Sequence, residues 1–169
     1  MALPKILKDF NLFGDGNNWQ GQIPNLTIPE LSRRMVEYDG GGMDGPVEVD
    51  MGQELVTFEW TAGGLIAEIF GTYGSPIHDA TMLRFAGSYE SDEDGQVVPV
   101  EIVVRGRHKT IGMGEASKGD ANTQSITTTC SYYKLVINGQ TVIEIDIPGH
   151  VFLVNGEDRL AQRRQALGL

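Results

Sequence analysis

The sequence lacks the residue patterns on which most metal and redox sites depend. Its 169 residues include a single cysteine, Cys130, so no internal disulfide can form and no zinc site can be built from cysteines. We expect Cys130 to be a small buried residue in a threonine-rich strand. The three histidines, His78, His108 and His150, are scattered, and none has a second ligand at metal-binding spacing. We therefore predict exposed loop histidines, no metal site and no cofactor.

Long apolar runs and clusters of basic residues are also missing. No stretch approaches the ~20 apolar residues of a transmembrane helix, and no charged segment followed by an apolar core marks a signal peptide. We therefore expect no membrane anchor, and folding in the cytoplasm. The 13 basic and 23 acidic residues give a formal net charge of −10. Because binding by counterion release needs clustered lysine and arginine, we predict that the free protein does not bind double-stranded DNA.

No catalytic motif is complete. The glycine-rich segment Gly112–Gly119 is not a phosphate-binding loop, because its lysine precedes a glycine and no helix is predicted after it. Acidic pairs two residues apart occur in two expected strands, Glu48 with Asp50 and Glu144 with Asp146. A glycosidase needs two carboxyl groups facing each other across a cleft, whereas alternate residues of a strand share one face. We predict solvated acidic strand faces, no catalytic residue and no enzyme.

Glycine is what the chain has in excess. It supplies 22 of 169 residues, about 13%, against a typical ~7%, and no collagen-like period accompanies it. With alternating segments rich in Val, Ile, Thr and Tyr, this composition is typical of a turn-rich β domain. We expect residues 1–169 to form one domain. The clearest strand pairs are 81–89 with 97–105, and 123–137 with 141–147, the second closed by an Asn-Gly turn.

Two helices are predicted beside the strands. Thr61 can cap an internal helix whose apolar stripe packs across a sheet. That stripe contains Leu65, Ile66, Ile69 and Phe70. Asn155 can cap a short closing helix that ends at Gly168, and the polar segment 108–122 is expected to be a long loop. The predicted fold class is therefore mainly β, an antiparallel β-sandwich or barrel with one packed internal helix and a short C-terminal helix.

The most informative stretch is 33–51. Residues 33–38 and 47–51 are predicted to be the two strands of a long hairpin, the second with an apolar and an acidic face. A hairpin needs only two to five residues to turn, but this one has a longer, glycine-rich tip. The tip residues are Asp39, Gly40, Gly41, Gly42, Met43, Asp44, Gly45 and Pro46. Because surplus loop length at a tip often contacts something outside its own domain, we predict that this loop assembles subunits or rings.

Several short segments along nearly the whole chain together match a known family. They are Asn11–Phe13, Asp15-Gly16, Ile23–Pro29, Gly41–Val47, Met51-Gly52, Ser131–Leu135, Glu144–Asp146 and Val154–Leu169. In their order and spacing these segments resemble the major tail tube proteins of contractile-tailed bacteriophages and of R-type pyocins.

This resemblance implies a tail-tube fold and a structural function. Proteins of the family form hexameric rings, in which each subunit gives strands to a continuous β-barrel around a channel. The rings stack into a tube inside a contractile sheath, and the tube is driven through the target envelope. The implied partners are other copies of the chain and the tail sheath, baseplate, tape measure and terminator proteins. DNA passes along the channel without specific binding. The implied location is the virion, a phage tail or tail-like particle assembled in the host cytoplasm.

Three interpretations of function stay open at this point. In a phage tube, the acidic residues would repel DNA phosphates if they faced the channel. These residues are Glu48, Asp50, Glu144 and Asp146. A pyocin-like particle without DNA would use the same tube, and only neighbouring capsid genes would separate the two. A monomeric β-sandwich binding module, for example for carbohydrate, would instead show aromatic residues on an exposed face, but Trp60 is expected to be buried.

Overall fold

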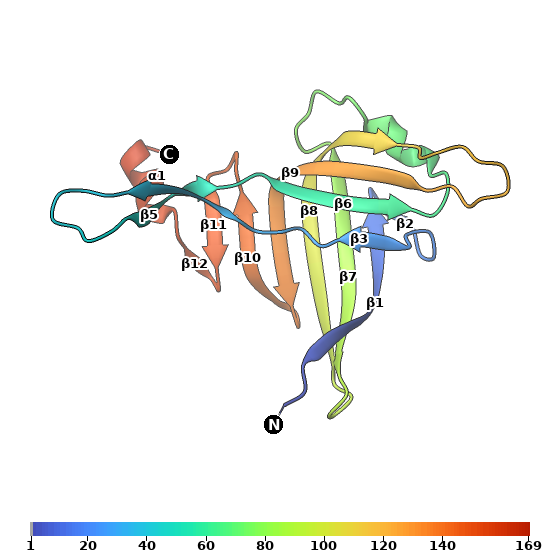
Figure 1. Cartoon of the computed structure of the whole chain (residues 1–169), viewed down its shortest axis with the longest axis horizontal. Coiled ribbons are helices and arrows are strands. Elements are labelled where there is room, and N and C mark those ends of the chain that lie inside the picture. The colour runs from blue at the N-terminus through green and yellow to red at the C-terminus, as the bar shows by residue number, and fades with distance from the viewer. Residues whose placement is uncertain (1) are drawn as a thin grey trace.

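Two long strands in the second half of the chain build both layers of the fold. The computed structural model describes residues 2–169. In it β8 (Val97–Gly112) and β9 (Gln124–Ile137) pair antiparallel along most of their length. The first half of β9 also pairs with β6 (Val56–Ala62), whereas its second half pairs with β10 (Gln140–Asp146). Because both strands bend between these halves, one group of strands crosses over the other (Figure 1).

The remaining strands extend these two layers. The main path runs in the order β12-β11-β10-β9-β8-β7-β1-β2, and β3 pairs with the free edge of β6. The elements not yet given are β1 (Lys5–Gly14), β2 (Asn17–Asn18), β3 (Asn25–Thr27), β4 (Arg33–Tyr38), β5 (Val47–Gln53), the 3₁₀-helix η1 (Ala67–Thr72), β7 (Thr81–Ser91), β11 (Val151–Val154), β12 (Glu157–Asp158) and α1 (Ala161–Leu167). The prediction of a mainly β, antiparallel fold is confirmed.

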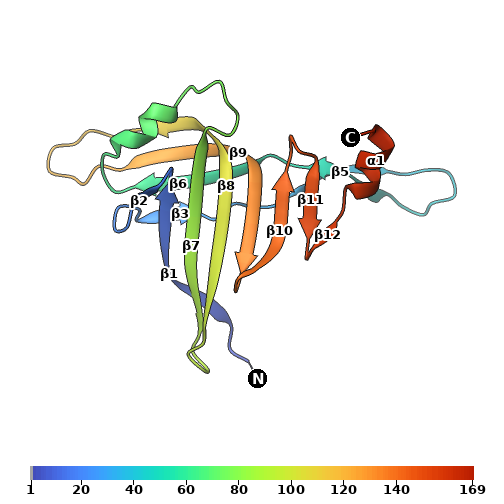
Figure 2. The ribbon, with the colours of Figure 1, turned by 180° about the vertical axis from the view of Figure 1, so that it is seen from behind.

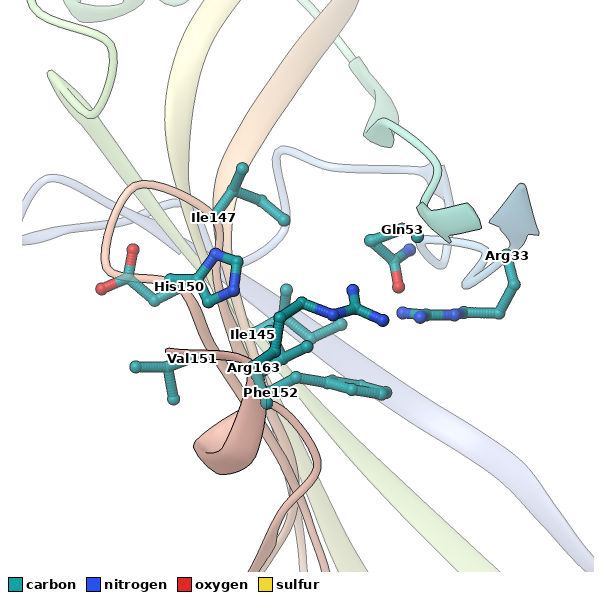
Figure 3. A pocket seen from close by; sticks show the side chains of 11 residues that line it. Arg33, Gln53, Ile145, Ile147, His150, Val151, Phe152 and Arg163 are labelled. Carbon is teal, nitrogen blue, oxygen red and sulfur yellow. The ribbon is translucent and has the colours of Figure 1, made fainter. Parts of the chain in front are cut away.

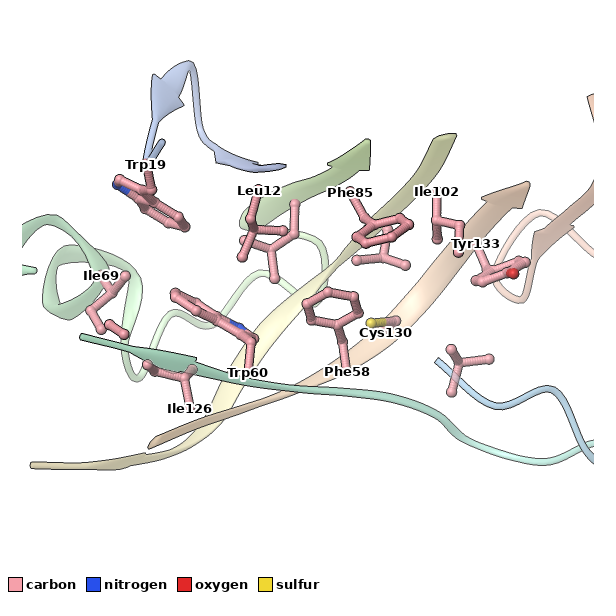
Figure 4. Close-up of a cluster of buried hydrophobic side chains, with 14 of the residues drawn as sticks. Leu12, Trp19, Phe58, Trp60, Ile69, Phe85, Ile102, Ile126, Cys130 and Tyr133 are labelled. Atoms are coloured by element: carbon pink, nitrogen blue, oxygen red, sulfur yellow. The ribbon is translucent and has the colours of Figure 1, made fainter. Parts of the chain in front are cut away.

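The apolar core lies between the crossing layers. Val56, Phe58 and Trp60 alternate along β6 and are all buried, as the period of two in a strand requires. They meet side chains from the other layer, including Phe85 of β7 (Figure 4). The indole rings of Trp19 and Trp60 stack with their centroids 5.1 Å apart. Cys130 is also buried and unpaired, which confirms the prediction of a small filler.

A glycine permits the bend that the two layers share. Gly106 is buried at the point where the register between β8 and β9 shifts. A Cβ atom at this position would collide with the backbone carbonyl of Thr129. Only glycine therefore allows β8 to approach β9 this closely at the bend.

The internal helix differs from its prediction. Thr61 is not a helix cap but lies in β6, paired with Asn25 on one side and Ser125 on the other. The helical segment begins only at Ala67, is a 3₁₀-helix and has no capping side chain. Of the expected apolar stripe, Ile66 and Ile69 are buried while Leu65 and Phe70 are exposed. Strand pairing on both sides of Thr61 thus overrides the local helix signal.

The C-terminal helix also begins later than predicted. The helix α1 begins after Leu160, not at Asn155, because Asn155 and Gly156 form the turn between β11 and β12 with φ of 50° and 81°. The predicted end is confirmed, since Gly168 adopts a left-handed conformation with φ of 73°. The strand predicted over 141–147 ends at Asp146, and Ile147 is 52% exposed.

The expected loop 108–122 is shorter than predicted. β8 continues to Gly112, and His108 is buried in the core, where its Nδ1 lies 2.9 Å from the Thr128 hydroxyl. The expectation that all three histidines are exposed in loops is therefore wrong for His108, and His150 is half-buried in a turn.

The sheet is open rather than a closed barrel. Its path begins at β12 and ends at β2, and β3 forms a further edge. Within residues 2–169, no helix is long and apolar enough to cross a membrane.

Candidate assembly surface

The hairpin β4–β5 forms a two-stranded sheet of its own that projects from the crossed layers (Figures 1 and 2). Its register places Val36 opposite Val49 and Glu37 opposite Glu48, as the predicted hairpin requires. Because cross-strand partners share a face, one face of this arm is apolar and the other is largely acidic. The side chains of the apolar face are Val36, Tyr38, Val47, Val49 and Met51.

The apolar face of the arm is left open to solvent. Its five side chains are 43–59% exposed, and none belongs to the core. Contiguous apolar surface rimmed by charge marks an interaction site in soluble proteins. The edges of a separate two-stranded sheet add unpaired backbone groups. The arm therefore carries apolar side chains and backbone groups that a neighbouring protein could cover.

The tip loop 39–46 makes its hydrogen bonds internally. The Met43 amide donates to the Gly40 carbonyl at 3.1 Å, and the Gly40 amide lies 3.3 Å from the Met43 sulfur. Gly42 has φ of 87°, a conformation that favours glycine. Met43 itself stays 38% exposed. The loop is shaped by its own sequence and adds little to the stability of the subunit that carries it.

The root of the arm is fixed to the body. The Arg33 Nε atom donates to Asp50 at 2.8 Å, and the Arg33 guanidinium lies 4.9 Å from the centre of the Phe152 ring in β11. The pKa of Asp50 is held below its usual value, first by the hydrogen bond from Arg33 and then by that from the Gly52 amide. Nothing in the sequence pointed to the Arg33–Phe152 contact, because its partners lie far apart in the chain. This anchoring sets the direction in which the arm projects.

The two predicted acidic pairs lie on different elements. Glu48 and Asp50 are on the arm, on the side opposite its valines. Glu144 and Asp146 are on β10, where Glu144 accepts a hydrogen bond from the Tyr132 hydroxyl at 3.0 Å. No strand pairing joins the arm to β10 within residues 2–169.

The surface around the β10 pair also carries positive charge, which sequence reasoning missed. Lys134 lies opposite Glu144. The Arg105 guanidinium lies 5.5 Å from the Tyr132 ring, and Arg84 pairs with Glu101 at 3.0 Å. These basic residues come from separate strands, so only the register between the strands shows that they lie near the acidic pair. Among residues 2–169, no group of three or more His, Cys, Asp or Glu side chains could hold a metal ion.

Comparison with known proteins identifies the chain's family. The sequence model of the family described as phage tail tube protein FII matches residues 4–168. The chain belongs to this family of phage tail tube proteins. It is 40% identical over 172 aligned residues to the tail tube protein of Escherichia phage P2, with 100% of both chains covered. It is 36% identical to the major tail tube protein of Serratia phage KSP20, with 100% of this chain and 99% of the relative covered.

Solved structures confirm the tail-tube fold. A chain in the anti-feeding prophage baseplate superposes with a TM-score of 0.59 at 9% identity, covering 80% of this tail tube protein and 97% of that chain. A chain in an extracellular contractile injection system, the sheath–tube complex in its extended state, gives 0.54 at 13% identity, covering 82% and 93%. At these identities the likeness concerns the fold alone. The resemblance seen in the sequence and the predicted tail tube function are confirmed by the family match and the two phage relatives.

Proposed function

We propose that this tail tube protein, as a single domain over residues 1–169, forms the inner tube of a contractile phage tail. Its copies form hexameric rings, and the rings stack around a channel through which DNA passes. The observation that carries this proposal is the arm β4–β5, whose apolar face is exposed along its whole length. In the tube, this face and the tip loop 39–46 lie against a neighbouring copy.

The open sheet supports closure between subunits. Strands at β2, β3 and β12 end the sheet with unpaired backbone N–H and C=O groups. A sheet that is open in one subunit becomes a barrel when the edge strands of neighbours pair, and this pairing removes the edges that take part in it. Assembly thus gives hydrogen-bond partners to backbone groups, and buries apolar side chains, that the single chain leaves exposed.

The partners and the particle follow from the same role. The tube contacts the sheath, baseplate, tape measure and terminator proteins, and it is assembled in the host cytoplasm before it becomes part of the virion. DNA slides past without specific binding, because the net charge of −10 repels phosphates. Glu48, Asp50, Glu144 and Asp146 contribute to this repulsion where they face the channel. Full-length similarity to tail tube proteins of two phages favours a phage tail over a particle without DNA.

Negative-stain microscopy of the purified protein at increasing concentration tests the proposal. The parent is expected to form rings or tubes. A variant with loop 39–46 replaced by Asn-Gly, and a milder one with Met43→Ala and Asp44→Ala, should remain monomers with nearly unchanged melting temperature. The matched control, Ile77→Ala with Asp79→Ala, changes an apolar and an acidic residue of another loop and should assemble normally. Arm variants that polymerise like the parent would show that the loop is not an assembly element.

A further inference from the structure

A small pocket lies at the root of the arm, where β4, the β10–β11 turn and α1 meet (Figure 3). Its volume is about 180 Å³. Arg33 from β4 and Arg163 from α1 direct their guanidinium groups toward each other across it, with Gln53 beside them. Ile145 and Phe152 contribute apolar lining. Two like charges thus face one space in a chain that is otherwise strongly acidic.

The pocket contains hydrogen-bonding groups without a partner. Asp50 accepts from the Nε atom of Arg33, but the two terminal nitrogens of Arg33 have no partner among residues 2–169. The Arg163 guanidinium likewise has no hydrogen bond or ion pair within that range. The Nε2 atom of His150 is buried without a partner. Asp146 also lines the pocket and accepts a hydrogen bond from the Gly149 amide, but within residues 2–169 it forms no ion pair with Arg33 or Arg163.

We propose that this pocket is a carboxylate-binding site, filled in the assembled tube by an acidic side chain of a second copy. The proposal rests on the proposed function for the source of the carboxylate. Guanidinium groups present paired N–H donors that match the two oxygens of a carboxylate, and charge-assisted bonds of this kind are the strong ones. Asp50 already pairs with Arg33, and a bound carboxylate would supply the partner that Arg163 lacks within residues 2–169. A DNA phosphate is disfavoured, since two arginines are no basic cluster in a chain of net charge −10.

The position of the pocket points to a neighbouring subunit. It adjoins the root of the arm, whose apolar face already needs a cover from another copy. At the opposite end of the long axis, loop 113–123 projects from between β8 and β9 (Figures 1 and 2). This loop carries Glu115 and Asp120, both exposed and without a side-chain hydrogen bond or ion pair within residues 2–169. Because the loop lies far from its own pocket, it is suited to the pocket of the next copy.

Such a contact joins two different surfaces of the same chain. Head-to-tail interfaces of this type close into rings or continue as filaments, depending on the rotation between copies. The pocket–loop contact therefore gives the assembly a direction. The apolar arm supplies most of the buried area, and the charged contact selects the register of the neighbour.

Charge reversal in two separate chains tests the contact. Arg163→Glu alone should raise the critical concentration for assembly about tenfold or more, since a lost charge-assisted contact costs at least ~1.4 kcal/mol. The loop variant Glu115→Arg with Asp120→Arg should be defective to a similar degree. An equal mixture of the two variants should assemble better than either variant alone, because the parent pocket of one variant can then meet the parent loop of the other. Arg159→Glu is the control, since Arg159 is exposed and pairs only with Glu157.

Acetate separates a neighbour's side chain from a free ligand. Added to the monomer, acetate should shift the side-chain NMR signals of Arg33 and Arg163, and Arg163→Gln should abolish both shifts. No shift in the parent would overturn the site. If acetate shifts the NMR signals but mixing the two variants does not improve assembly, the carboxylate does not come from a second copy. The pocket would then be a site for a small carboxylate.

The pocket contact and the role of the arm can be refuted separately. If Arg163→Glu assembles like the parent while the arm variants do not, the pocket contact is refuted and the tube proposal stands. If the arm variants also assemble, the role proposed for the arm fails, and the acetate titration still decides whether the pocket binds a carboxylate.

Discussion

Replacing the central pair of the arm's apolar face, Val36 and Val49, with serine is expected to weaken assembly strongly and leave the subunit folded. The two side chains are opposite each other and are 50% and 43% exposed. Fully burying a valine contributes ~1.5–3 kcal/mol, so covering the exposed half of each contributes about 1 kcal/mol. The pair then accounts for about 2 kcal/mol per contact, which corresponds to an approximately 30-fold weaker contact in the variant.

The matched control for this prediction lies on the other face of the same hairpin. Glu37 and Glu48 are the neighbouring cross-strand pair, and two like charges opposite each other repel. Glu37→Ser with Glu48→Ser should therefore leave assembly intact and the arm unchanged or slightly more stable. Sedimentation gives the polymer fraction against protein concentration, and circular dichroism gives the melting temperature. If the valine variant assembles at the parent's concentration, or if both variants are equally defective, the apolar face is not the contact.

Three further predictions concern the subunit itself. Gly106→Ala should lower the free energy of unfolding by about 1–3 kcal/mol in urea denaturation, because its Cβ atom collides with the Thr129 carbonyl. Burial lowers the pKa of His108 from its usual 6.5, so below pH 6.5 the unfolded chain binds a proton more readily than the folded chain. The free energy of unfolding should therefore fall as the pH drops below 6.5, and His108→Gln should remove this contribution to the fall. Burial raises the pKa of the Cys130 thiol to about 12, so disulfide reagents should react only after unfolding.

Strands and turns governed by neighbouring residues were predictable from the sequence. The alternation of Val56, Phe58 and Trp60 is typical of a strand with one buried face, and the structure buries all three. Asn138 and Gly139 predicted a tight turn, and their φ angles of 52° and 79° are those that a type I′ turn needs. The arm was predictable for the same reason, since its two strands are close in sequence.

Features that depend on distant pairing were not predictable. Thr61 has an intrinsic tendency to cap a helix, but β9, more than sixty residues later, pairs with β6 and keeps Thr61 in a strand. His108 lies in a polar stretch, yet the bend of β8 carries it under Trp60, with ring centroids 6.2 Å apart. Of the candidate site, the arm and its loop came from the sequence. The pocket did not, because Arg33 and Arg163 lie far apart in the sequence and face one space only in the folded chain.

The same sequence pattern has opposite outcomes in β5 and β6, and this difference explains how the chain separates folding from assembly. Val56, Phe58 and Trp60 of β6 are 1–3% exposed, whereas Val47, Val49 and Met51 of β5 are 43–51% exposed. Near the end of β5, Gly52 adopts φ of 126°, a conformation that side-chain-bearing residues rarely adopt, and the register between β4 and β5 shifts beside it. No residue of β5 belongs to the core that β6 helps to form. Substitutions on the arm can therefore change contacts between copies without loosening the layers that hold each copy together.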